Sequence, residues 1–130
     1  MPGTISAPSK FPKSRRLLKH ADFQRVYQTG RRQFTGNMTV FFLRREAAQE
    51  ESPRVGLTVG KVLGGAVERN RIKRRMREAV RLSTAACVVP IDIVLNPRKS
   101  VLTLPFTELA NEVGRCLRLA GQRARSAEAK

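Results

Sequence analysis

The sequence predicts a single mixed α/β domain with a strongly basic surface, and three observations lead to this prediction. Its 130 residues are enough for one domain with a modest core. Segments with helical and with extended hydrophobic patterns follow one another in the order helix, strands, helix, strand, helix. Lysine and arginine total 26 against 10 acidic residues, which gives a formal net charge of +16. A charge of this size attracts polyanions from a distance, and nucleic acid is the obvious partner.

The first predicted helix covers residues 21–28 and ends before Gly30, a residue type that often follows a helix. Phe23, Val26 and Tyr27 share one face of it. We assign Val26 to the core. Phe23 and Tyr27 lie one turn apart near several arginines, and aromatic rings beside basic side chains are typical of single-stranded RNA binding. Packing of both rings in the core is an equally supported alternative on this evidence.

Three extended segments are predicted before the second helix and one after it. Residues 37–44 are rich in β-branched and aromatic side chains, and a short strand over residues 32–35 is expected to join them. Residues 54–61 alternate strictly, with an apolar face made of Val55, Leu57 and Val59. The opposite face is small and polar, which suits an extended ligand lying against the sheet. Residues 87–95 are predicted to form a buried strand.

The densest basic segment, residues 64–82, has the pattern of a helix with one buried face. The face expected to be buried carries Ile72, Met76, Ala79, Val80 and Ser83. The opposite face carries Asn70, Arg74, Arg77 and Arg81, and is widened by Arg69, Arg71, Lys73 and Arg75. Exposed helices usually mix both signs of charge, whereas here like charges gather and arginine dominates. Because a guanidinium group matches phosphate oxygens, the pattern favours a nucleic-acid-binding face over an ordinary solvated one.

A last helix is predicted over residues 105–120, with Pro105 in its first turn. We therefore expect one RNA-binding α/β domain over residues 15–120. Residues 1–14 contain three prolines and no hydrophobic periodicity, so they are expected to form a disordered basic tail. Residues 121–130 are expected to form a frayed C-terminal tail.

Residues that would support catalysis or metal binding are scattered along the chain. Cys87 and Cys116 match neither a metal-binding spacing nor a redox pair, and we interpret them as buried residues of a protein in a reducing compartment. His20 has no nearby partners for a triad or a metal cluster. Four acids are spread along the chain without a two-metal pattern, and each is expected to pair with a neighbouring base: Asp22, Glu68, Glu78 and Asp92. The chain contains no long apolar run, so a membrane partner is not expected.

Three stretches resemble the protein subunit of bacterial ribonuclease P. The opening of that family is similar to Arg15-Arg16-Leu17, Asp22-Phe23, Val26-Tyr27 and Gly30. Its third strand is similar to Arg54-Val55-Gly56-Leu57-Thr58-Val59 followed by Lys61. Its signature helix is similar to Ala66-Val67 and Arg69-Asn70-Arg71-Ile72-Lys73-Arg74. The resemblance covers roughly residues 15–119 and is highly specific in the signature helix.

The resemblance implies a compact two-layer sandwich of a four-stranded mixed sheet with three helices, in αβββαβα order, with a left-handed βαβ crossover. It also implies that the protein binds the catalytic RNA and the 5′ leader of precursor tRNA, helps to remove the leader, and broadens the substrate range. The chemistry would belong to the RNA and to Mg²⁺ ions in the RNA–substrate active site, with no cofactor bound by the protein alone. A cytoplasmic location, no membrane contact and no small-molecule substrate are expected.

The resemblance also assigns roles to particular positions. Residues expected to bind the catalytic RNA are Arg69, Asn70, Arg71, Lys73, Arg74, Arg77 and Arg81. Residues expected to line the leader-binding cleft are Phe23, Tyr27, Thr58, Lys61 and Arg98.

Three other classes of protein are considered besides this one. A structural ribosomal-RNA-binding protein shares small size and basicity, but would not prefer precursor over mature tRNA. A stand-alone nuclease is disfavoured by the lack of an acid–base or metal constellation in the sequence. A double-stranded DNA binder ranks last, because no base-reading helix or dimer pattern is evident.

Overall fold

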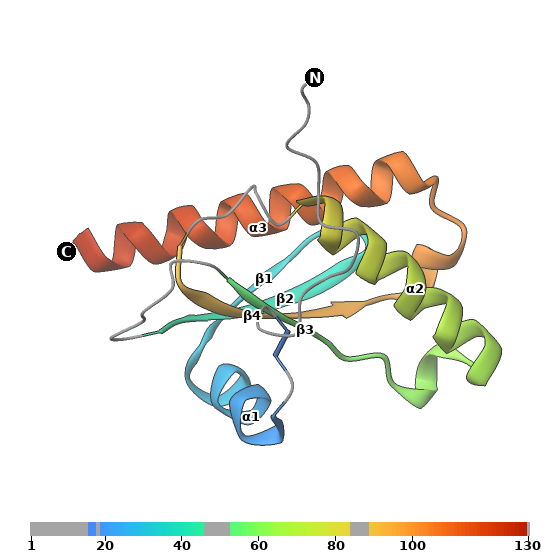
Figure 1. The fold of residues 1–130 in the computed structure, drawn as a ribbon, viewed down its shortest axis with the longest axis horizontal. Helices are drawn as coiled ribbons and strands as arrows, with labels where there is room; N and C mark the ends of the chain where they lie inside the picture. The colour runs from blue at the N-terminus through green and yellow to red at the C-terminus, as the bar shows by residue number, and fades with distance from the viewer. Residues whose placement is uncertain (1–15, 18, 46–52, 84–88, 130) are drawn as a thin grey trace.

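The computed structural model describes residues 16–17, 19–45, 53–83 and 89–129, so the predicted tail at 1–14, Arg15 and Cys87 lie outside the described residues. The helices and strands follow the predicted order (Figure 1). They are α1 (His20–Thr29), β1 (Arg31–Phe34), β2 (Met38–Arg44), β3 (Arg54–Leu57), α2 (Ala66–Ser83), β4 (Ile91–Pro97) and α3 (Phe106–Ala129). Two short 3-10 helices, η3 (Lys61–Leu63) and η5 (Lys99–Leu102), precede α2 and α3.

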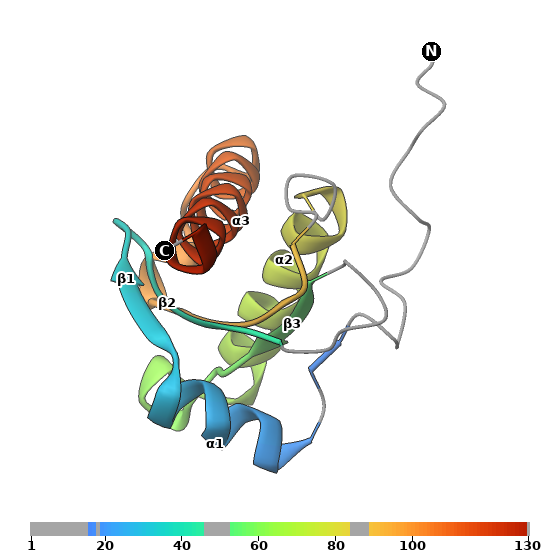
Figure 2. The ribbon, with the colours of Figure 1, turned by 90° about the vertical axis from the view of Figure 1, so that its left-hand side faces the viewer.

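The four strands form one mixed sheet in the order β1-β2-β4-β3. β1 pairs with β2 and β2 with β4 in antiparallel fashion, whereas β3 runs parallel to β4. With α2 toward the viewer and these parallel strands pointing up, β4 lies to the left of β3, as Figure 1 and Figure 2 together show. The β3–α2–β4 connection is therefore left-handed, as the resemblance implied and against the usual right-handed rule.

The main hydrophobic core lies between the sheet and the helices α2 and α3. Alternation along β2 and β4 sends Val40, Phe42 and Ile93 into this core, where they meet Ile72 and Met76 of α2. Helix α1 covers part of the opposite face (Figure 2), over a smaller cluster formed by Leu17, Val26 and Val94 with Phe23, Phe41 and Leu43. The mixed α/β sandwich is confirmed, but α1 adds a partial third layer to the two layers that were predicted.

Helix α3 continues to Ala129, beyond residue 120, where the last helix was predicted to end. Ala124 is buried in the main core. Arg123 donates a hydrogen bond to Oε1 of Gln33 at 3.0 Å, and Arg31 donates to the carbonyl oxygen of Arg123 at 3.2 Å. These contacts with the edge strand β1 stabilise the last turns of the helix, and nothing in the local sequence of α3 indicates them.

Two strand boundaries also differ from the prediction. β3 ends at Leu57 rather than at residue 61, because the chain turns into η3, although the Thr58 N–H still donates to the Leu95 carbonyl oxygen at 3.1 Å. β4 begins after Pro90, which has no N–H to donate, and runs on to Pro97.

The β1–β2 turn is fixed to α3 by a buried carboxylate. Glu112 accepts hydrogen bonds from the backbone N–H of Asn37 at 2.9 Å, from its side-chain amide at 2.6 Å, and from the Thr35 hydroxyl. Burial raises the pKa of Glu112, but these hydrogen bonds outweigh it, so the pKa lies below its usual value. The turn is thus held in one conformation by a charged group.

Candidate nucleic-acid interface

The face of the sheet that carries α1 is organised in cross-strand rows. One row is charged at its centre and contains Arg54, Asp92 and Leu43. The next contains Gly56, Val94, Phe41 and Arg32. A third contains Thr58, Asn96, Thr39 and Phe34. Helix α1 crosses these rows, so successive turns of α1 face charged, then small and apolar, then polar side chains of the sheet.

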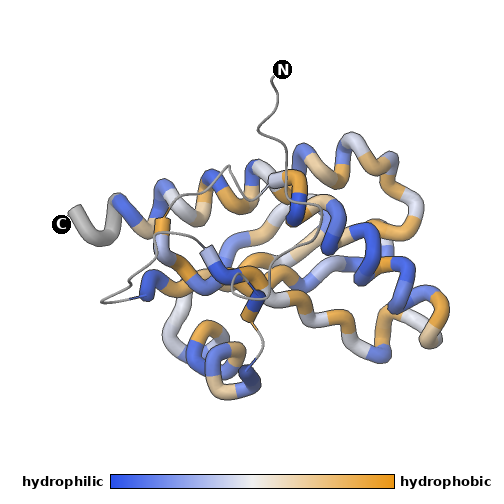
Figure 3. The backbone as a smooth tube through the Cα atoms, viewed as in Figure 1, coloured by the Kyte–Doolittle hydropathy of each residue, from blue (hydrophilic) through white to orange (hydrophobic). Residues whose placement is uncertain are grey.

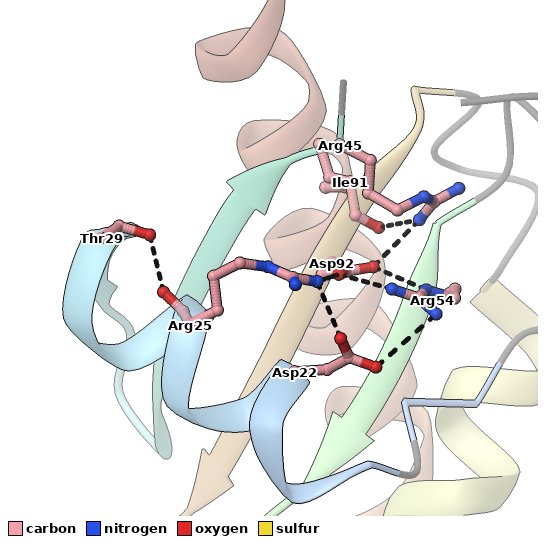
Figure 4. Close-up of polar contacts among 7 residues, drawn as sticks. All are labelled: Asp22, Arg25, Thr29, Arg45, Arg54, Ile91 and Asp92. Atoms are coloured by element: carbon pink, nitrogen blue, oxygen red, sulfur yellow. Dashed lines mark hydrogen bonds and ion pairs between the residues drawn. The ribbon is translucent and has the colours of Figure 1, made fainter. Parts of the chain in front are cut away.

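At the first row α1 is held by an ion-pair network centred on Asp92, whose side chain is 1% exposed (Figure 4). Arg54 donates to both carboxylate oxygens of Asp92 at 2.8 Å, and Arg45 donates to one of them at 3.1 Å. Arg25 of α1 bridges Asp92 at 3.4 Å and Asp22 at 2.8 Å. The hydrogen bond to Asp92 raises the pKa of Arg54. The predicted pairing of Asp22 and Asp92 with neighbouring bases is confirmed.

At the second row Phe23 lies half-buried against the backbone of β3. A Cβ added to Gly56 would lie 2.5 Å from Cζ of Phe23. The small face of β3 is therefore filled by this ring, and the expectation that it is left free for an extended ligand is wrong at Gly56. Beside the ring is a cavity of about 190 Å³ lined by Arg16, Leu17, Phe23, Val55, Gly56, Leu57, Arg77 and Val80. Phe23 thus packs partly into the small apolar cluster, and the rest of its side chain borders this cavity.

At the third row Tyr27 is held by its hydroxyl group. The hydroxyl shares a hydrogen bond with Oγ1 of Thr58 at 2.7 Å and donates to Oδ1 of Asn96 at 3.2 Å. Its ring meets Phe41 edge to face at 4.8 Å between centroids, and 37% of the residue remains exposed. Tyr27 and Thr58, both predicted site residues, are brought together. Asn96 was missed, and its place in a polar row became visible only once the strand register was known.

The two predicted basic residues of the cleft follow the neighbouring parallel strands β3 and β4. Lys61 is exposed at the start of η3, just beyond β3. Arg98 is exposed after β4, and its guanidinium group donates to the carbonyl oxygens of Thr35 at 3.2 Å and Gly36 at 3.1 Å. The side chain of Arg98 therefore reaches the β1–β2 turn, whereas Lys61 lies beyond the end of β3.

Helix α2 presents the predicted faces to the core and to solvent. Its five predicted core residues are all buried. Asn70, Arg71, Arg74 and Arg77 are exposed, and Arg69 and Lys73 are partly exposed. Figure 3 shows α2 as largely hydrophilic along its length. The helix begins after Gly64, whose φ of +130° favours glycine, and the Glu68 carboxylate accepts the N–H of Gly65 at 3.1 Å. Glu68 thus caps the helix instead of pairing with a base as predicted.

Two arginines of α2 have structural partners. Arg75 donates to the carbonyl oxygens of Val101 at 2.9 Å and of Leu104, and its guanidinium carbon lies 6.0 Å from the Phe106 ring centroid. It therefore fixes η5 and the start of α3 and does not widen the basic face as predicted. Arg81 pairs with Glu78 at 3.0 Å, so Glu78 is paired with a neighbouring base, as predicted.

Arg77 connects the two surfaces that the sequence treated separately. It is exposed on α2 among the residues expected to bind the catalytic RNA, and it also lines the cavity beside Phe23. Among the described residues there is no group of three or more His, Cys, Asp or Glu side chains that would hold a metal ion, and no helix long and apolar enough to span a membrane.

An arginine-rich helix beside an aromatic cleft on a mixed sheet defines a class, the small basic α/β proteins that bind RNA. Comparison with known proteins gives the family. The family model for ribonuclease P matches residues 11–121. The ribonuclease P protein component of Desulforapulum autotrophicum is 39% identical over 105 residues, covering 81% of this chain and 87% of that protein. The corresponding protein of an Exiguobacterium species is 41% identical over 101 residues, covering 78% and 85%.

The fold is also similar to solved structures of RNase P proteins. The RNase P protein of Staphylococcus aureus superposes with a TM-score of 0.69 at 30% identity, covering 83% of this chain and 96% of that one. The RNase P protein of Thermotoga maritima gives 0.69 at 25% identity, covering 79% and 94%. This chain belongs to the bacterial ribonuclease P protein family and is the protein subunit of that ribonucleoprotein. The predicted family is confirmed, and the ribosomal alternative is not favoured.

Proposed function

We propose that the exposed face of α2 binds the catalytic RNA of ribonuclease P, and that the surface between α1, the sheet and Arg77 binds the 5′ leader of precursor tRNA. The observation that carries this proposal is the fixed position of Tyr27. Its ring stays partly exposed while its hydroxyl is held by Thr58 and Asn96, one turn of α1 away from Phe23, which borders a cavity.

The α2 surface is suited to a folded RNA because it offers exposed guanidinium groups from a rigid helix. Arg71, Arg74 and Arg77 recur one turn apart, and guanidinium groups bind phosphate oxygens bidentately. Each phosphate that is neutralised releases counterions, so affinity should fall with salt by a log–log slope of about −0.7 to −0.9 per contact.

The cleft surface is suited to a single strand of varied sequence. Stacking of a base on an aromatic ring contributes roughly 1–3 kcal/mol and depends little on base identity. The basic groups at its edges, among them Arg16, Arg77 and Lys61, would neutralise the leader's phosphates. Only a precursor has a leader to occupy this surface. The subunit would therefore increase the affinity for precursor relative to mature tRNA and would broaden the range of substrates that are processed.

We assign the hydrolytic step to the catalytic RNA and to Mg²⁺ held with the substrate, in the cytoplasm. The acids nearest the cleft, Asp22 and Asp92, are engaged by arginine side chains that anchor α1. On this account the protein positions the substrate, and its carboxylates maintain the fold.

The test measures the affinity of two tRNAs that differ only in the leader, for the reconstituted ribonucleoprotein and for the catalytic RNA alone. We expect the ribonucleoprotein to bind the precursor more tightly than the mature tRNA by a larger factor than the RNA alone does. An equal preference with and without the protein would contradict the leader-binding role.

A further inference from the structure

The polar row that holds Tyr27 continues across the sheet to an exposed aromatic residue. Asn96 lies opposite Thr39, and Thr39 lies opposite Phe34 on the edge strand β1. Phe34 is 63% exposed, more than Tyr27 at 37%. With neighbouring strands about 4.8 Å apart, the backbone of Phe34 lies about 10 Å from that of Asn96. The row of side chains that begins beside Tyr27 therefore extends across the sheet to the edge strand β1.

Cationic groups accompany the Phe34 ring. The guanidinium carbon of Arg32 lies 5.2 Å from the ring centroid, which is a cation–π distance. Arg98 donates to the carbonyl oxygens of Thr35 and Gly36, the two residues that follow Phe34. An exposed ring with guanidinium groups beside it offers a stacking surface for a base and charge for its phosphates.

The backbone that carries Phe34 is also held in place. Glu112 fixes Thr35 and Asn37, and the Ser100 hydroxyl bonds Oδ1 of Asn37 at 2.6 Å. A ring on a fixed turn loses little conformational freedom when a ligand binds. An exposed phenylalanine on a sheet edge would also suit contact with a second copy of the chain. A net charge of +16 opposes self-association and favours a polyanion.

We propose that Phe34 and Arg32 form a second stacking subsite for single-stranded RNA, which receives a nucleotide of the tRNA leader beyond those held at Tyr27. This inference rests on the proposed leader-binding function. Helix α2 contacts β3, whereas β1 is the opposite edge of the sheet. If the catalytic RNA lies on α2, the β1 edge is farther from the cleavage site, so Phe34 meets the more distal part of the leader.

The experiment measures the affinity of the reconstituted ribonucleoprotein for precursor tRNAs whose leaders are lengthened one nucleotide at a time. The variants are Phe34→Ala, Phe34→Trp and Tyr27→Ala, with Leu119→Ala as a control that removes an apolar side chain of similar exposure on α3. We expect Phe34→Ala to weaken binding roughly five- to hundredfold, but only beyond a leader length greater than the one at which Tyr27→Ala takes effect. Phe34→Trp should retain the affinity, and Leu119→Ala should change nothing.

The possible failures are distinguishable. If Tyr27→Ala shows a length-dependent loss and Phe34→Ala shows none, or shows the same loss with mature tRNA, the second subsite is wrong and the proposed function stands. If neither variant depends on leader length, the proposed function itself fails. If sedimentation shows a dimer of the free wild-type protein that Phe34→Ala dissociates, the edge is a contact between copies and the subsite is overturned.

Discussion

Tyr27 shows how one side chain can be both anchored and available. Its hydroxyl is bound to Thr58 and Asn96, its ring meets Phe41 in a T-shaped contact, and more than a third of the residue remains exposed. A ring fixed in this way needs no reorganisation before a base stacks on it. If Tyr27 binds the leader as proposed, its hydrogen bonds and its ring should make separate contributions to the affinity.

Substitutions of Tyr27 should separate these two contributions. Tyr27→Phe removes the hydroxyl and keeps the ring, so we expect leader affinity to fall by about 0.5–1.5 kcal/mol at most. Tyr27→Ala removes the ring as well and should cost about 1–3 kcal/mol per lost stacked base. Equilibrium binding of precursor tRNA to the ribonucleoprotein measures both. Equal losses for the two variants would show that the ring does not stack on the leader.

At the scale of elements, helix α1 is held on the sheet from two sides. Val26 and Phe23 anchor it through the small apolar cluster, and Asp22 and Arg25 anchor it through Asp92. Because α1 carries both Phe23 and Tyr27, the ion-pair network helps to hold these two rings in place on the sheet.

Replacing the central acid of this network should destabilise the whole domain. Asp92→Asn leaves Arg45 and Arg54 beside a buried neutral amide, and removing one partner of a buried ion pair typically costs about 3–5 kcal/mol. Urea denaturation monitored by circular dichroism measures this loss. Glu78→Gln, at the exposed pair with Arg81, is the matched control and should change the unfolding free energy little. Similar effects of the two substitutions would contradict the anchoring role of Asp92.

The β1–β2 turn should make stability depend on pH through Glu112. Its pKa is lowered in the folded protein, so its contribution is fully present above the usual value of 4.5 and is lost as the pH falls through the lowered pKa. We expect Glu112→Gln to be less stable than the wild type at neutral pH, with a difference that shrinks below pH 4.5. Denaturation curves over a pH series measure this difference. A difference that stays constant with pH would show that the charge of Glu112 is not what holds the turn.

At the scale of the whole molecule, hydrophobic periodicity predicted the order of elements and the buried face of α2. Those features depend on side chains near one another in the sequence. The packing of α1 on the second face, the ring of Phe23 over Gly56, and the continuation of α3 along β1 depend on contacts between distant segments, which no local pattern encodes. For the same reason Arg75 was grouped with the exposed arginines, although its partners are the carbonyl oxygens of Val101 and Leu104.

Under the proposed function, the two kinds of RNA contact lie on separate surfaces of the molecule. Exposed arginines lie along α2, while the rings of Phe23, Tyr27 and Phe41 lie on α1 and on the sheet face that α1 covers. Helices α1 and α2 lie on opposite faces of the sheet (Figure 2). The central claim is that these surfaces bind different RNAs, with Arg77 at their boundary. The claim requires that a change on one surface leaves binding at the other unaffected.

The most direct test compares Arg74→Ala with Tyr27→Ala in two binding measurements: the protein with the catalytic RNA, and the saturated ribonucleoprotein with precursor and mature tRNA. Arg74→Ala should weaken the first and reduce its salt slope by about 0.7–0.9, leaving the preference for precursor intact. Tyr27→Ala should lower that preference and leave the affinity for the catalytic RNA unchanged. Losses of the same size in both measurements for both variants would contradict the two-surface account.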